Sequence, residues 1–260
     1  MTLPAGEVQR LAGAILDRIL SAAYPAGLRL PAEIELADEF ACGRSTVREA
    51  LRHLADLGLV RSRRGSGAMV LDYKREGTPA LLPAFLQGGR FEVPLSVMAS
   101  ELLRIRTLMA CEAVRLAARY ATREGLADAR ARLGDAPALQ DDPVRHASNE
   151  LELYRALVAA SGIWPAAWLV NSFWGPLGEA HRMLAPVMGP VPAGFQRTME
   201  EVLDHIDQRR ELEAVALVQR WFERVDADLV AVLETAVASV RKGAERKRSS
   251  SSRRQRGGKE

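Results

Sequence analysis

Cysteine is nearly absent from the sequence, with only Cys42 and Cys111 in 260 residues. The two are far apart and form no CxxC or Cys/His pattern, so a disulfide framework and a zinc knuckle are not indicated, and we interpret both as packed thiols. No run of eighteen apolar residues occurs, which argues against a membrane-spanning helix. The first residues lack the charged and apolar regions of a signal peptide, and we therefore expect a cytoplasmic protein without a membrane partner.

Catalytic and metal-binding patterns are also missing. The four histidines, at positions 53, 146, 181 and 205, are scattered, and no two stand at helical ligand spacing. There is no nucleophile with a paired base, no phosphate-binding glycine loop and no cluster of metal ligands. An enzyme is the main rival class for the second half of the chain, but the sequence favours a binding protein without metal or cofactor.

Charge is distributed unevenly along the chain. Residues 1–75 contain 11 Lys/Arg and 9 Asp/Glu, and residues 241–260 contain 9 and 2, so the part between them has an excess of six acids. An acidic body between basic ends does not suit a protein that coats nucleic acid, but it suits one that contacts DNA through a single module.

The first 75 residues predict helices and a hairpin. Apolar residues spaced by three and four indicate a helix over 8–19, and a second helix begins near Pro31 after an extended stretch that ends at Leu30. We expect Ser45 to be the N-cap of a third helix with Val47, Ala50, Leu51 and Leu54 inside. Gly58 ends that helix, and two strands, 59–63 and 68–71, join through a glycine-rich tip.

The outer face of the third helix carries Arg44, Arg48 and Arg52, and residues 44–64 contain six Lys/Arg against two acids. A helix fits the major groove of DNA, arginines reach guanine edges or phosphates, and hydroxyls such as those of Ser45 and Thr46 reach phosphates. A charge run is more often a solvated surface. Here the cap, the turn and the hairpin all agree with DNA binding.

The second half predicts helices only. Residues 76–95 resemble a linker with a short helix near 81–86, and a long amphipathic helix follows over 96–122. Further helices are expected near 124–133, 146–160, 165–185, 195–208 and 211–238, which makes 96–240 an all-helical domain. Residues 241–260 have almost nothing to bury and are expected to be disordered. The predicted fold class is therefore mainly α: a winged helix-turn-helix with a small β-hairpin, followed by a helical bundle.

Four segments carry a specific resemblance: Pro25 to Glu33 (PAGLRLPAE), Ser45 to Leu51 (STVREAL), Leu57 to Val60 (LGLV) and Arg64 to Gly67 (RGSG). Together they resemble the DNA-binding domain of the GntR family of regulators. The resemblance implies that Arg44, Ser45, Thr46 and Arg48 contact DNA from the recognition helix, and Arg64 and Gly65 from the wing. Two positions differ: Ile34 replaces a frequent arginine, and Ala41 replaces the usual turn glycine.

The helical half resembles the effector domain of the FadR branch, through its helix order and residues 153–162 (LYRALVAASG). Many members bind a divalent metal through an Asp, a His four residues later and two further histidines. The corresponding positions here are Glu150, Tyr154, Met199 and Trp221, so no metal site is expected. In that respect the chain is similar to the fatty-acyl-CoA-responsive type.

Six residues are candidate effector contacts, because their side chains suit the lining of a cavity or the binding of an anion. They are Arg104, Tyr154, Arg155, Trp174, His181 and Arg182. Arg106 is a further candidate anion partner, although each arginine is also explained by a surface ion pair. The aromatic residues between 164 and 222 either fill the core or line a cavity.

These observations predict a regulator that binds a palindromic double-stranded operator as a homodimer and responds to a small-molecule effector, a fatty acyl-CoA or an organic acid. The dimer surface could lie in either domain. The alternative is an architectural DNA-binding protein without an effector, for which the basic tail is the argument.

Overall fold

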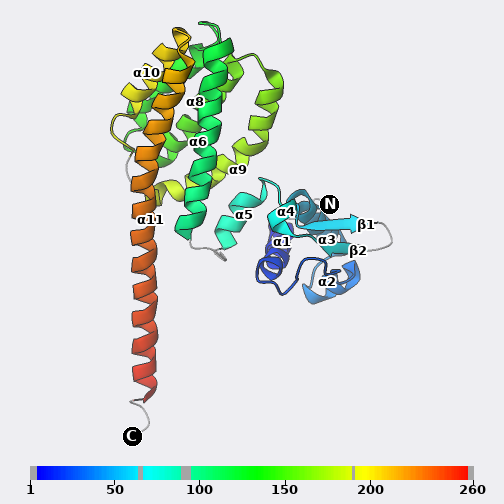
Figure 1. The fold of residues 1–260 in the computed structure, drawn as a ribbon. Helices are drawn as coiled ribbons and strands as arrows, with labels where there is room; N and C mark the ends of the chain where they lie inside the picture. Colours follow the sequence, from blue (N-terminus) through cyan, green and yellow to red (C-terminus); the bar gives the residue numbers. More distant parts are fainter. Residues whose placement is uncertain (1–4, 64–66, 89–94, 189–190, 257–260) are drawn as a thin grey trace. The chain divides into compact units, whose positions relative to one another are not determined.

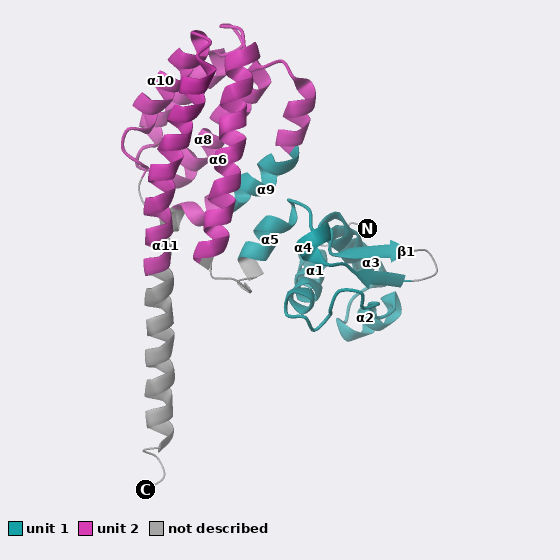
Figure 2. Ribbon diagram, in the orientation of Figure 1, with its two compact units in different colours: residues 1–90, 172–180 teal, residues 91–171, 181–260 magenta. Residues whose placement is uncertain are grey.

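The computed structural model describes residues 5–63, 67–88, 95–188 and 191–256 (Figure 1). Helices dominate this part of the chain, and its strands β1 (Val60–Arg63) and β2 (Gly67–Val70) form one antiparallel pair. The predicted fold class, mainly α with a small hairpin, is confirmed. Two compact units are distinguished, residues 1–90 with 172–180 and residues 91–171 with 181–260 (Figure 2).

The first unit is a winged helix-turn-helix. Its helices are α1 (Ala5–Leu20), α2 (Glu33–Glu39), α3 (Arg44–Asp56), α4 (Tyr73–Glu76) and α5 (Leu81–Gly88). The apolar residues that predict the first helix are buried in a common core with those of α2 and α3, among them Ile15, Leu36, Val47 and Leu54. Burial of each such side chain contributes roughly 1.5–3 kcal/mol, which is more than helix propensity supplies to such short helices.

The wing is attached to the body by a third extended segment. The amide of Leu30 donates to the carbonyl of Ala68 over 2.8 Å, and the amide of Val70 donates to the carbonyl of Leu28 over 2.8 Å. These bonds use the edge of β2 that β1 leaves open, so the extended stretch expected before Pro31 serves as a partner of the wing.

The chain that follows the wing returns to the end of α3. The amide of Thr78 donates to the carbonyl of Leu57 over 3.1 Å, and its hydroxyl donates to the carbonyl of Asp56 over 3.0 Å. Leu81 is buried in the winged core, and Phe85 packs against it. The expected short helix is therefore present as α5, but these residues extend the winged unit beyond the boundary at 75 instead of forming a free linker.

The second unit is helical. It contains α6 (Leu95–Tyr120), α7 (Ala127–Asp135), the 3-10 turn η1 (Ala136–Leu139), α8 (Pro143–Ala160), α9 (Trp164–Met188), α10 (Phe195–Asp207) and α11 (Glu211–Arg256). Figure 1 shows α6 and α11 side by side, and the two helices pack against each other. The long helix expected over 96–122 is α6, and the other predicted helices also match described ones. No helix among the described residues is long and apolar enough to cross a membrane.

The last helix is longer than the stretch 211–238 predicted for it. Helix α11 runs on to Arg256, through most of the stretch 241–260 that we expected to be disordered. The residues there include good helix formers such as Ala, Glu, Lys and Arg, and no proline. Extending an existing helix also avoids the cost of nucleation, so a polar segment can stay helical without a core of its own.

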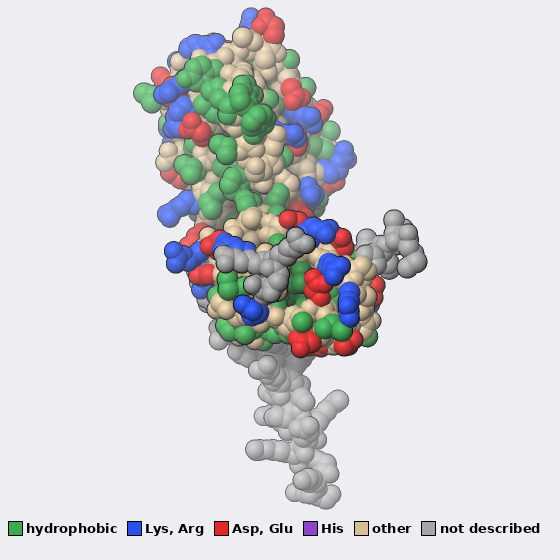
Figure 3. All heavy atoms as spheres, turned by 90° about the vertical axis from the view of Figure 1, so that its right-hand side faces the viewer, with side chains coloured by type: hydrophobic (Ala, Val, Ile, Leu, Met, Phe, Trp, Pro, Cys, Tyr) green, Lys and Arg blue, Asp and Glu red, His purple; other side chains and the backbone are tan. Residues whose placement is uncertain are grey.

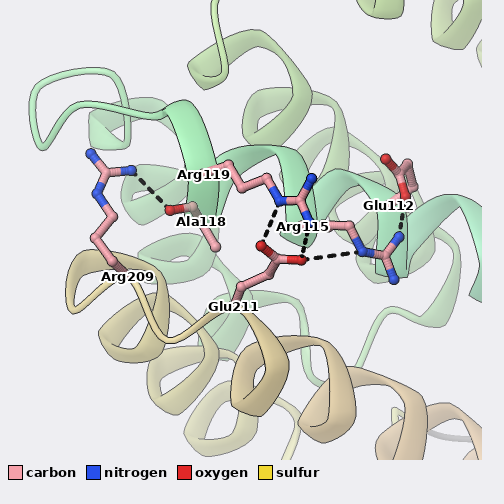
Figure 4. A network of polar contacts seen from close by, with 6 residues as sticks. All are labelled: Glu112, Arg115, Ala118, Arg119, Arg209 and Glu211. Carbon is pink, nitrogen blue, oxygen red and sulfur yellow. Dashed lines mark hydrogen bonds and ion pairs between the residues drawn. The ribbon is translucent and has the colours of Figure 1, made fainter.

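A polar network joins the end of α6 to the turn between α10 and α11 (Figure 4). Glu211, at the first turn of α11, accepts from Arg119 over 2.5 Å and pairs with Arg115 at 3.6 Å. Arg209, in the turn, donates to the carbonyls of Ala118 and Ala121 over 2.9 and 2.6 Å. These carbonyls lie at the C-terminal end of α6, where a cation also meets the negative end of the helix dipole.

Replacing Arg209 with alanine is expected to lower the free energy of unfolding of the helical unit by about 1–2 kcal/mol. The substitution leaves the two carbonyls without their charged donor, and such bonds are worth more than neutral ones. Denaturant unfolding measures the loss. Arg210→Ala, at the adjacent exposed position, is the matched control and should change stability by less than about 0.5 kcal/mol.

Candidate nucleic-acid interface and effector cavity

The turn between α2 and α3 sets the direction of the third helix. Ala41 stands there with φ +50°, in the left-handed region that favours glycine. The amide of Cys42 donates to the carbonyl of Ala37 over 3.0 Å, which fixes the turn against the end of α2. The alanine at the usual glycine position therefore keeps the turn geometry and carries the strain of its Cβ.

Ala41→Gly is expected to stabilise the winged unit by about 0.5–1 kcal/mol. Relief of the left-handed strain, about 1–2 kcal/mol, exceeds the extra entropy that glycine loses on folding. Thermal or denaturant unfolding should detect the gain. Ala37→Gly is the control, because Ala37 is buried inside α2, where glycine should lower the stability. If both variants lose stability, alanine at position 41 is not strained.

Helix α3 begins two residues earlier than expected. Gly43 is its N-cap, with extended backbone, and its carbonyl accepts from the amide of Val47 over 3.1 Å. Ser45 is therefore an exposed residue of the first turn and not the cap. This corrects the predicted start of the helix, and it leaves the Ser45 hydroxyl at the surface.

The two faces of α3 are sharply different. Arg44, Ser45, Arg48 and Arg52 are exposed, as predicted. Thr46 is only 1% exposed and packs inside, so it cannot be a DNA contact in this conformation. It lies four residues before Ala50, which places both on the inner face of the helix.

The exposed arginines are held by surface carboxylates of the same unit. Nε of Arg48 donates to Glu33 of α2 over 2.7 Å, and Arg52 pairs with Glu49 at 2.7 Å. Such exposed pairs contribute about 0–1 kcal/mol, so a phosphate or a base edge can replace the carboxylate. Arg44 has no ion pair among the described residues. Figure 3 shows Lys and Arg side chains interspersed with Asp and Glu on the side of the molecule that carries the hairpin.

The wing lies beside this helix in the sequence and in the fold. Arg61 of β1 is exposed and pairs with Glu76 at 3.2 Å. The predicted wing contacts Arg64 and Gly65 lie outside the described residues. Gly67, at the start of β2, has φ +74°, so the hairpin tip needs a glycine for its geometry.

The predicted effector residues do not converge. Arg104, Arg155 and Arg182 are exposed, and Arg155 pairs with Glu152 of its own helix at 3.5 Å. Tyr154 is buried, and its hydroxyl contacts the sulfur of Met199 at 3.5 Å, so two of the positions aligned with family metal ligands meet in the core. Trp174 is half-buried in the segment 172–180 that belongs to the first unit. Of the six predicted residues, only His181 lines the cavity described next.

A small cavity of about 50 Å³ lies inside the helical unit. Its polar lining comes from Arg106 on α6, His146 and Glu150 on α8, and His181 on α9, each less than 10% exposed. Apolar residues of the last two helices and of the segment before α10 complete the wall, among them Phe195, Trp221, Val225 and Leu229. Four buried polar groups around one apolar-walled space are the feature of a ligand site.

Burial controls the protonation of these groups. Burial, Arg106 and His146 lower the pKa of His181 to about 3, and burial lowers the pKa of His146. Burial raises the pKa of Glu150, while the charge of Arg106 opposes that rise. The two imidazoles are therefore neutral at pH 7, and the guanidinium of Arg106 is the positive charge of the site.

Arg106 is anchored by the last helix. It donates to Asp226 of α11, and its guanidinium carbon lies 4.2 Å from the centre of the Phe222 ring. Its Nε has no hydrogen-bond partner among the described residues, and neither has Nδ1 of His146. No group of three or more His, Cys, Asp or Glu side chains suited to a metal ion occurs in the described part of the chain.

Comparison with known proteins assigns both units. Residues 7–70 match the family model of bacterial regulatory proteins of the gntR family, and residues 101–224 match the model of the FCD domain. The chain thus combines a DNA-binding domain of the GntR type with an FCD domain. It is 32% identical over 154 residues to an uncharacterised helix-turn-helix transcriptional regulator of Mycobacterium tuberculosis, covering 58% of this chain and 60% of that one.

Other relatives agree with this assignment. The chain is 31% identical to the Uxu operon transcriptional regulator of Escherichia coli, over 59% of this chain and 58% of that protein. The chain thus spans less than two thirds of the curated relatives' lengths. A solved structure of Lar from Listeria monocytogenes, 14% identical, has the same fold with a TM-score of 0.57, over 88% of this chain and 98% of that one. These relatives are named as regulators and not as enzymes.

The site residues of the GntR domain were easier to predict from the sequence than the residues that line the cavity of the FCD domain. Arg106 was a candidate by residue type, whereas the candidate two positions before it, Arg104, points to the opposite side of α6 because two residues turn a helix by about 200°. His146 and Glu150 are four residues apart on one face of α8, and that spacing was the available signal. The aromatic residues divide: Trp221 and Phe222 fill the core, whereas Trp164 and Trp168 are 61% and 63% exposed.

Proposed function

We propose that this chain is a transcription regulator that binds a two-fold symmetric DNA operator through its GntR domain and is controlled by a small molecule in the FCD domain. The observation that carries the proposal is the exposed row of Arg44, Ser45, Arg48 and Arg52 on α3, beside a hairpin wing. Its natural site of action is the cytoplasm, where the DNA is.

We infer that the chain acts as a homodimer. One winged domain makes too few base contacts for useful specificity, and a two-fold dimer doubles them over two half-sites. Sedimentation at micromolar concentration should give a dimer mass. A monomer with full operator binding would contradict this part of the proposal.

Selection of bound fragments from the source genome tests the whole function. We expect enrichment of a short palindrome, with affinity at least about 10³-fold above that for unrelated DNA at the same salt concentration. An architectural protein would bind all fragments with similar affinity. That outcome would reject the regulator and support the alternative.

The size of the cavity favours a small organic acid over a fatty acyl-CoA. A cavity of about 50 Å³ accommodates only a few heavy atoms, whereas drug-sized ligands occupy roughly 300–1,000 Å³. One relative, from Edwardsiella ictaluri, is named a fatty acid metabolism regulator, so both classes belong in the test. Titration of acyl-CoAs and short acids into the operator complex, read by gel shift, should release DNA with a short acid only.

A further inference from the structure

The net positive charge of the chain comes from its last twenty residues. Residues 241–260 contain 9 Lys/Arg and 2 Asp/Glu, whereas residues 1–240 contain 27 and 31. The larger part of the chain is therefore acidic and is repelled by a polyanion at long range, although α3 is locally basic. Any long-range attraction of the whole molecule to DNA has to come from this end of the chain.

The positive charge is concentrated on the last part of α11. Between Arg241 and Arg256, eight of the sixteen residues are Lys or Arg, and Glu245 is the one acid. We call residues 241–256 the C-terminal basic segment. Leu229 is the last buried residue among those of α11 whose exposure is described, and residues 231, 232, 234 and 235 are exposed. At the helical rise of about 1.5 Å per residue, the segment begins roughly 18 Å beyond Leu229 along the helix.

The composition of the C-terminal basic segment excludes several kinds of partner. A helix that lies on a membrane, or in a groove of another protein, needs a row of large apolar residues, and the segment has Ala244 as its one apolar residue. A single-stranded nucleic acid is held largely by stacking on aromatic side chains, and the segment has none. A polyanion recognised by its charge alone remains, and double-stranded DNA carries one negative charge per about 1.7 Å of its axis.

We propose that the C-terminal basic segment is a second DNA contact, which binds the phosphates of the double helix without reading the base sequence. Its sixteen residues span about 24 Å of helix, a length over which DNA carries roughly 14 phosphate charges. The winged unit of the same chain suits the major groove of double-stranded DNA, and DNA bound by one contact has a raised effective concentration at the other. This inference goes beyond the proposed function, because it concerns affinity for DNA of any sequence.

The sequence of the segment also predicts that DNA stabilises its helix. Like charges four residues apart, as at Lys242 and Arg246, disfavour a helix, and Gly243 and the four serines at 249–252 are weak helix formers. Phosphates placed among the like charges remove the repulsion. Amide hydrogen exchange in residues 241–256 should therefore slow at least severalfold when unrelated duplex DNA is added, whereas exchange in α8 should not change. Equal exchange with and without DNA would contradict the proposal.

The main experiment is fluorescence anisotropy of the full chain with two duplexes of equal length, the selected operator and an unrelated sequence. A fivefold variant replaces basic residues of the segment with glutamine, which has a similar helix propensity but no charge. We expect both affinities to fall by the same factor, at least about tenfold at 0.1 M salt, and the slope of log affinity against log salt to become shallower by about two to four. The substitutions are Arg246→Gln, Lys247→Gln, Arg248→Gln, Arg253→Gln and Arg254→Gln.

Two further variants control for net charge and for the type of contact. A matched variant removes five exposed arginines from the rest of the helical unit and should change both affinities by less than about threefold. Its substitutions are Arg123→Gln, Arg145→Gln, Arg182→Gln, Arg210→Gln and Arg220→Gln. Lysine in place of the four arginines of the first variant keeps the charge, and it should bind both duplexes as the wild type does, because lysine also binds phosphate as a point charge.

The proposal is overturned if the fivefold variant of the segment keeps wild-type affinity and salt slope, if it loses affinity for the operator alone, or if the matched variant loses as much. Single-stranded DNA and phosphatidylserine vesicles test the other polyanions. A larger loss of binding to either of these than to the duplexes would also overturn the proposal. Failure of the wild type to prefer an operator would reject the proposed function, and the unrelated duplex would still measure the contribution of the segment.

Discussion

Arg44→Ala and Arg48→Ala are each expected to weaken operator binding by about 1–3 kcal/mol, a factor of about 5 to 150, if the side chain reads a base. Both arginines are exposed on α3, at positions that share one face of the helix. An arginine that contacts phosphate instead should weaken binding to all sequences alike and reduce the salt slope by about one. Fluorescence anisotropy with operator and unrelated DNA, over a series of salt concentrations, separates the two cases.

Arg145→Ala is the matched control, because Arg145 is an exposed arginine of the helical unit. It removes the same charge and should leave operator affinity within a factor of two or so. Arg48→Lys keeps the charge but loses the planar fork, so it should bind unrelated DNA normally and lose discrimination. Wild-type binding by both alanine variants at moderate salt would show that α3 is not the reading helix.

The second large effect is expected from Gly58→Ala. Gly58 follows α3 with φ +76°, and a Cβ there would lie 2.1 Å from the carbonyl oxygen of Glu76. Left-handed strain of about 1–2 kcal/mol adds to the cost of moving packed backbone, so the winged unit should lose about 2–5 kcal/mol of stability. Hydrogen exchange of the α1 and α3 amides in the full chain should report the loss.

Gly27→Ala separates strain from collision. Gly27 has φ +84°, but nothing lies within 4 Å of the position that its Cβ would take. This variant should lose only about 1–2 kcal/mol. Equal losses of stability in the two variants would mean that the backbone at Glu76 moves away from the new Cβ at little cost. Backbone conformation alone would then make glycine necessary at residue 58.

The helices could be predicted from the sequence because their apolar residues repeat at the helical period, as Leu11, Ile15 and Ile19 do in α1. The error at Thr46 has a different source. A threonine near the start of a helix beside arginines suits a phosphate contact by residue type, but the packing of the unit decides which face it joins. Thr46 joins the inner face of α3 and is only 1% exposed.

The effector cavity needed the tertiary structure. Arg106, His146 and His181 come from three helices, and the sequence does not specify which sides of those helices meet. The motif aligned with family metal ligands was a guide to the region only: Tyr154 and Met199 do contact each other, in the core. The polar lining on α8 lies at Glu150, one turn before Tyr154, and at His146, two turns before it; the aligned positions included Glu150 but not His146.

The bonds of Thr78 to the end of α3 make that residue a mechanical anchor. The chain that continues towards the FCD domain is fixed to the carbonyls of Asp56 and Leu57 by Thr78, and then to the winged core by Leu81 and Phe85. Tension applied beyond residue 88 is therefore expected to meet the packed Leu81 and Phe85 first and to reach the carboxyl end of α3 next, through Thr78. A covalent pull along this route would act on α3 without a contact surface between the two domains.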